Sequence, residues 1–159
     1  MLSTESLQKI DHEVAKYPVD QKQSAVMAAL VIAQDEKGWL SSEMMEAVAQ
    51  HLGMAPVAVY EVATFYSMYN LQPTGRHKIT LCTCLPCGLQ GALAAADHLR
   101  DKLGIDFNQT TADGRFTLKE GECMGACAMA PVVLVNNKQM HDYMSNEKLD
   151  ALVDGLRKA

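Results

Sequence analysis

All five cysteines of the chain fall in two short segments, LCTCLPCGLQGA (residues 81–92) and ECMGACAMAP (residues 122–131). A strand-like stretch, residues 78–82, leads into the first segment, and an alanine-rich helical pattern over residues 89–103 follows it. Glycines and a proline keep the second segment in a loop. Because the ends of neighbouring strands share one edge of a sheet, we expect the two segments to meet there.

The spacing of these cysteines suits a [2Fe-2S] cluster, which takes two thiolates at each iron. The two pairs are Cys82-x4-Cys87 and Cys123-x3-Cys127. Each pair is expected to bind one iron, which leaves Cys84 outside the set. Four thiolates around the oxidised core give a net charge of about −2, and the N-terminus of a helix over residues 88–103 would favour that charge.

Two other chemistries use clustered cysteines. Four thiolates also bind zinc, although paired zinc ligands are usually separated by two residues, a spacing that only Cys84 and Cys87 show. The same two cysteines, placed between a strand and a helix, match the dithiol of a thioredoxin-like oxidoreductase, but that interpretation leaves the other three unexplained. A zinc-stabilised interaction module and a dithiol oxidoreductase therefore remain alternatives. Plain core packing is disfavoured, because the cysteines cluster beside glycines.

The rest of the 159-residue chain divides into two predicted domains, a helical bundle over residues 1–75 and an α/β domain over residues 76–159. Capping and periodicity predict four helices in the first: from Ser3 or Thr4 to Pro18, from Asp20 to about Asp35, from Ser41 or Ser42 to Gly53, and from Pro56 onward. In the fourth helix we expect Val57, Tyr60, Val62 and Phe65 to point to the core.

The second domain alternates strands and helices. Strands are predicted at residues 78–82, 115–120, 132–135 and 138–143, and helices at residues 89–103 and 146–157.

Charge and composition exclude several classes of function. The formal net charge of −5 argues against binding to nucleic acid or to anionic membranes. Residues 48–60 resemble a helix-turn-helix, but residues 38–75 contain no lysine or arginine to face phosphate. The longest early apolar run, residues 25–33, is too short to span a bilayer. The first five residues lack the basic start and apolar middle of a secretory signal, so we expect none. A cytoplasmic protein is expected, with membrane contact only through partners.

Several motifs resemble one family. The stretch from Leu81 to Ala92, the segment from Glu122 to Pro131, residues 62–66, the Pro73-x-Gly75 turn and residues 113–116 are similar to the thioredoxin-like [2Fe-2S] ferredoxin subunits of respiratory NADH dehydrogenase, known as the E subunit of bacterial complex I and the 24 kDa subunit in mitochondria. The resemblance covers residues 5–157. By position, it identifies Cys82, Cys87, Cys123 and Cys127 as the cluster ligands.

The resemblance implies an N-terminal helical bundle followed by a thioredoxin-like [2Fe-2S] ferredoxin domain. It also implies an electron-transfer subunit of NADH-quinone oxidoreductase, within a peripheral arm at the cytoplasmic face of the inner membrane. The partner would be a subunit carrying FMN and the NADH site, with further peripheral-arm subunits. The chain has no dinucleotide-binding glycine motif, which agrees with a subunit that carries electrons only. Equivalent subunits of NAD-linked hydrogenases or formate dehydrogenases remain alternatives.

Overall fold

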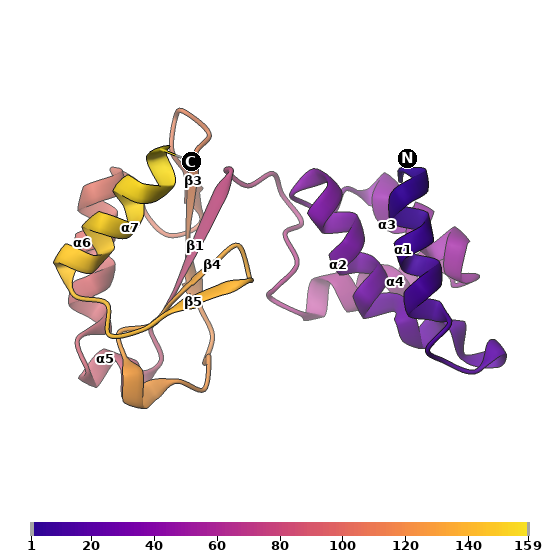
Figure 1. The fold of residues 1–159 in the computed structure, drawn as a ribbon, viewed down its shortest axis with the longest axis horizontal. Helices are drawn as coiled ribbons and strands as arrows, with labels where there is room; N and C mark the ends of the chain where they lie inside the picture. Colours follow the sequence, from indigo (N-terminus) through magenta and orange to yellow (C-terminus); the bar gives the residue numbers. More distant parts are fainter. Residues whose placement is uncertain (1, 159) are drawn as a thin grey trace. The chain divides into compact units, whose positions relative to one another are not determined.

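The structure is a computed structural model that describes residues 2–158. The chain separates into two compact units, Met1–Pro73 and Thr74–Ala159, called the N-terminal and C-terminal units below (Figure 1). Each unit is described by itself. Within residues 2–158, no helix is long and apolar enough to cross a membrane.

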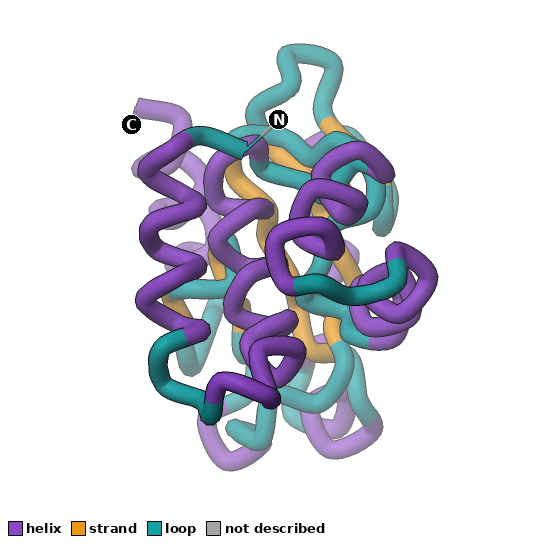
Figure 2. Tube along the Cα trace, turned by 90° about the vertical axis from the view of Figure 1, so that its right-hand side faces the viewer, coloured by secondary structure: helices purple, strands orange, loops and turns teal. Residues whose placement is uncertain are grey.

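The N-terminal unit is built from helices. They are α1 (Thr4–Val14), a 3₁₀ helix (Val19–Ala25), α2 (Val26–Lys37), α3 (Ser42–Leu52) and α4 (Pro56–Phe65). The second helix was predicted to begin at Asp20, but the backbone of Gln21 leaves the helical region (φ −118°, ψ 28°), so the regular helix begins only at Val26. Figure 2 draws the helices in purple and the loops that connect them in teal.

The ends of α1, α2 and α3 follow the predicted caps. The hydroxyl of Ser3 accepts a hydrogen bond from the Ser6 amide at 3.2 Å, and that of Ser41 accepts one from the Met44 amide at 3.3 Å. Such side-chain bonds help to satisfy the amides of the first turn, which have no carbonyl partner one full turn earlier. The Met44 amide also donates to the Ser41 carbonyl at 3.0 Å. Gly38 ends α2 with φ +82°, a left-handed conformation that glycine adopts without strain.

The core of the N-terminal unit is apolar, but α4 contributes to it differently from the prediction. Buried aliphatic side chains from every helix form this core, with Ile10, Leu30, Val48 and Val59 fully enclosed. Three of the four α4 side chains predicted to be buried are instead exposed: Val57 by 64%, Tyr60 by 50% and Phe65 by 80%. The helix buries Val59 and Ala63 instead. The buried face was predicted wrongly because the residues of α4 are apolar on nearly all sides, so periodicity alone does not identify the side that faces the core.

The C-terminal unit holds one five-stranded sheet with helices packed on it. The elements are β1 (His77–Cys82), α5 (Leu85–Leu89), α6 (Ala92–Leu103), β2 (Gln109–Thr110), β3 (Phe116–Gly121), a 3₁₀ turn (Cys127–Met129), β4 (Val133–Val135), β5 (Gln139–His141) and α7 (Asn146–Lys158). The strand order is β2-β3-β1-β4-β5. β1 and β3 are parallel, and all other neighbours are antiparallel.

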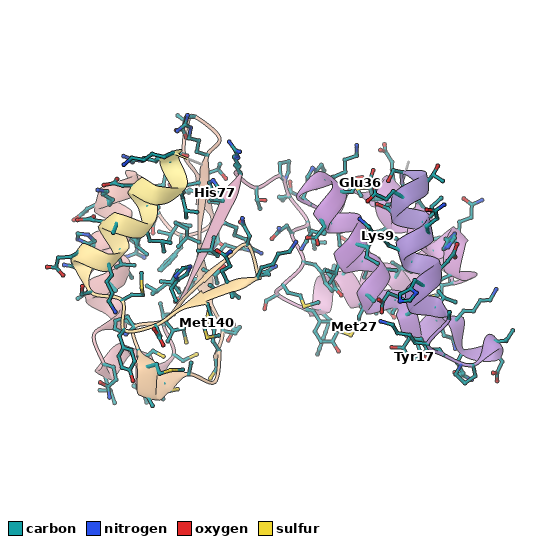
Figure 3. All side chains as sticks on the ribbon, in the orientation of Figure 1. Lys9, Tyr17, Met27, Glu36, His77 and Met140 are labelled. Atoms are coloured by element: carbon teal, nitrogen blue, oxygen red, sulfur yellow. The ribbon has the colours of Figure 1, made fainter. Side chains whose placement is uncertain are left out.

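Alternating residues of the central strands bury one face of this sheet. Ile79 and Leu81 of β1, Phe116 and Leu118 of β3, and Val133 and Val135 of β4 form a core with apolar side chains of α6 and α7. The two helices lie side by side on the sheet (Figure 1). His77 lies at the start of β1 (Figure 3). The centroid of its ring is 5.7 Å from that of Phe116. The helical bundle and the α/β domain confirm the fold class predicted from the sequence.

The helix after the first cysteines is shorter than predicted. Gly91 adopts φ +93° and separates the five-residue α5 from α6, so the long helix begins at Ala92 rather than Gly88. Cys87 therefore lies inside α5. The N-terminus of a helix over residues 88–103 was expected to stabilise the negative charge of the cluster. Because the long helix begins only at Ala92, and a helix dipole acts within about one turn of the helix end, this stabilisation does not arise as predicted.

Candidate metal centre

The two cysteine segments begin at the same edge of the sheet. Parallel pairing of β1 with β3 sets Cys82 opposite Gly121, so both strands end at this pair. The chain then continues into α5 on one side and into residues 122–131 on the other. The amide of Cys82 donates to the carbonyl of Val132 at 3.2 Å, which ties the end of the second segment to the first.

The five cysteines differ in exposure. Cys82 and Cys87 are almost fully buried, at 1% each, and form a small apolar cluster with Ala92. Cys84 and Cys127 are half-buried and pack against this cluster, as do Met124 and Ala130. Cys123 is exposed.

Packing brings four of the cysteines into one group. Cys84 and Cys127 pack against the buried Cys82 and Cys87. Cys123 lies four residues before Cys127 in the second cysteine segment. Three of the four predicted ligands, Cys82, Cys87 and Cys127, thus lie together, and the fourth lies in the same loop as Cys127.

The pKa values of the two buried thiols shift in opposite directions. Burial raises the pKa of Cys87 to about 12, and the neighbouring Cys82 adds to the shift. Burial also acts to raise the pKa of Cys82, but hydrogen bonds from the backbone amides of Cys84 and Met124 outweigh it, and the pKa lies below its ordinary value. Donors that stabilise a thiolate also stabilise a metal-bound sulfur, since ligation requires loss of the proton.

A side-chain hydrogen bond joins the two loops next to these sulfurs. The Thr83 hydroxyl donates to the Glu120 carboxylate at 2.6 Å. Beside it, Gly121 lets the end of β3 lie close to β1. A Cβ at this position would lie 2.8 Å from Thr80 Cγ2 and 3.1 Å from the Leu81 carbonyl oxygen. Sequence reasoning missed both features, because neither Gly121 nor the Thr83–Glu120 pair belongs to a local pattern.

The donors present fit a [2Fe-2S] cluster. Such a cluster needs two thiolates at each of two irons. The first loop brings Cys82 and Cys87 together, and the second loop packs Cys127 against them and carries Cys123.

This fold and this group of cysteines define an iron–sulfur carrier of the thioredoxin type. The chain belongs to the thioredoxin-like [2Fe-2S] ferredoxin family, which it matches over residues 10–157. The resemblance found in the sequence is thereby confirmed.

Its relatives carry a more particular name. The chain is 44% identical over 152 residues to the second NADH-quinone oxidoreductase E subunit of Rhizobium meliloti, covering 96% of this chain and 89% of that protein. It is 43% identical over 145 residues to the NADH-quinone oxidoreductase E subunit of Rickettsia bellii, covering 91% of this chain and 86% of that protein. It is 38% identical to NADH-quinone oxidoreductase subunit 2 of Thermus thermophilus, covering 93% of this chain and 82% of that protein.

Among solved structures, an NAD⁺-reducing [NiFe]-hydrogenase in the H₂-reduced state shares the fold. The TM-score is 0.69 at 22% identity, over 81% of this chain. The match spans only 22% of that hydrogenase chain. At this identity the likeness concerns the fold alone.

Proposed function

We propose that this chain is the electron-transfer E subunit of an NADH-quinone oxidoreductase, and that it holds one [2Fe-2S] cluster on Cys82, Cys87, Cys123 and Cys127. The observation that carries the proposal is the meeting of the two cysteine loops at the Cys82–Gly121 edge of the sheet. The E-subunit relatives, which match nearly the whole chain, support it. When bound, the cluster accepts and releases one electron at a time.

The residues of the chain bind the cluster, shield it and shape its surroundings. Cys82 and Cys87 are held in a buried cluster that excludes water from one side. Cys123 is exposed, so a cluster that it binds lies near the surface, where a redox partner can approach. We propose that this partner is the subunit that carries FMN and the NADH site, and that the complex lies at the cytoplasmic face of the inner membrane.

Replacing each cysteine by serine tests the ligand set. Cys82→Ser, Cys87→Ser, Cys123→Ser and Cys127→Ser should each lose or grossly alter the cluster, measured as iron and acid-labile sulfide after anaerobic purification. Cys84→Ser is the matched control and should keep about two irons and two sulfides per chain. A Cys84→Ser chain without iron would show that Cys84 is a ligand, and stoichiometric zinc in the parent would favour the zinc module instead.

The N-terminal unit is proposed to dock onto the flavin-carrying subunit. Its helix α4 presents Val57, Tyr60 and Phe65 to solvent, three large apolar side chains that cost free energy when left in water. Their spacing in the sequence places them on neighbouring turns of one helix.

A paired substitution tests this docking. Val57→Ser together with Phe65→Ser should weaken co-purification with the flavin-carrying subunit and leave iron content unchanged. Val19→Ser is the control, since Val19 is 87% exposed in the same unit but lies outside α4. Equal loss of binding in both variants, or no loss in either, would contradict the role of α4.

A further inference from the structure

The hydrogen bond between Thr83 and Glu120 lies where the second cysteine segment begins. The half-buried Thr83 stands between Cys82 and Cys84 in the first segment, and its hydroxyl donates to the Glu120 carboxylate at 2.6 Å. Glu120 lies near the end of β3, three residues before Cys123. This bond, called the loop tether below, therefore joins the first segment to the entry of the second.

The second segment is tied at its exit by a backbone bond. There the Cys82 amide donates to the Val132 carbonyl at 3.2 Å, and no side-chain substitution removes this bond. In between, residues 123–125 make no hydrogen bond to another backbone group within the described residues 2–158. Cys123 is also the exposed member of the proposed ligand set. Of the four ligands, it therefore depends most on the loop tether for its position.

We propose that Thr83 is a positioning residue for the [2Fe-2S] cluster, and that the loop tether sets how long the cluster stays bound. The inference rests on the proposed function, because it requires Cys123 to be a ligand. Loss of a cluster requires the ligands of one loop to move away from the iron that they bind. A hydrogen bond that joins the two loops stabilises the closed arrangement and makes such local opening rarer. Groups that orient metal ligands affect metal affinity in this way.

The test compares variants of the full chain, purified without oxygen, with the parent. Thr83→Val replaces the donor hydroxyl by a methyl group, and Thr83→Ser retains a hydroxyl. Glu120→Ala removes the acceptor, and combining it with Thr83→Val completes a double-mutant cycle. Thr111→Val is the matched control, because the Thr111 hydroxyl donates to the Asp113 carboxylate at 2.5 Å in the turn before β3, at the other end of that strand.

Cluster loss is followed as the decay of visible absorption in excess iron chelator, and the melting temperature of each chain is measured by circular dichroism. Thr83→Val and Glu120→Ala should each lose the cluster about five- to tenfold faster than the parent, the effect of one partly exposed hydrogen bond to a charged group. The double variant should lose it no faster than either single variant, because both changes remove the same bond. Thr83→Ser and Thr111→Val should lose it at the rate of the parent.

The outcomes separate this inference from the proposed function. A parent chain without an iron–sulfur cluster would overturn both. A Thr83→Val chain that carries a full cluster and loses it at the rate of the parent would overturn the inference alone. Additive effects in the double variant, or equally fast loss from Thr111→Val, would also overturn it. Iron-free Thr83→Val and Glu120→Ala beside loaded Thr83→Ser and Thr111→Val would support it, as the limit of faster loss.

Discussion

Replacing Gly121 by alanine should destabilise the C-terminal unit and loosen the metal centre. The added methyl group would lie 2.8 Å from Thr80 Cγ2, 2.9 Å from Met124 Cε and 3.1 Å from the Leu81 carbonyl oxygen. The Met124 side chain can move away, but Thr80 and Leu81 belong to the central strand β1. Overpacking of this kind costs about 1–3 kcal/mol. The lower entropy of the unfolded alanine chain offsets about 0.4–1 kcal/mol of that cost.

A net loss of about 1–2 kcal/mol corresponds to a fall in the melting temperature of roughly 4–16 °C for a domain of this size. The assay is thermal unfolding of the anaerobically purified chain, followed by circular dichroism, with iron content measured in parallel. Gly155→Ala is the matched control: nothing lies within 4 Å of its added methyl group, and it sits inside α7, so it should stabilise by about 0.5–1 kcal/mol. Shifts of the same sign in the two variants would refute the reasoning.

Three further substitutions probe other parts of the chain. Lys78→Met should raise stability at pH 7 by about 1–3 kcal/mol, because burial, with Lys119 nearby, lowers the pKa of Lys78 from 10.5 to about 8. Between pH 8 and 10.5 the unfolded chain then binds more protons than the folded chain, so the parent gains stability as the pH rises through that window. The higher urea midpoint of Lys78→Met should therefore approach that of the parent there, and a difference that fails to shrink would contradict this. Gln34→Ala should cost about 1–3 kcal/mol in urea unfolding, because Gln34 accepts from the Asn70 amide at 2.6 Å and donates to a carbonyl at 3.1 Å; unchanged stability would show that these bonds are replaced by water. Phe65→Ser alone should change the melting temperature little, since the side chain is 80% exposed, and a large fall would place it in a core.

The fold was predictable where the signal is local. Ser3 and Ser41 mark helix starts, Gly38 marks a helix end, and the apolar runs of β1 and β4 mark strands. β2 escaped prediction because it is two exposed residues, Gln109–Thr110, that gain strand character only from pairing with β3.

Features set by tertiary contact could not be predicted in the same way. The exposed side of α4 depends on which neighbours cover the helix, and its sequence is apolar almost throughout. At the metal centre, spacing identifies the candidate ligands, but the packing of Cys84 and Cys127 against Cys82 and Cys87 forms only once the two loops meet at the edge of the sheet.

The most direct test of the central claim is electron paramagnetic resonance of the full chain, purified without oxygen and reduced with dithionite. Four thiolates from the two loops, closing on a single [2Fe-2S] cluster, predict a low-temperature signal that integrates to about one unpaired electron per chain. A reduced sample that gives no such signal and contains stoichiometric zinc would contradict the account.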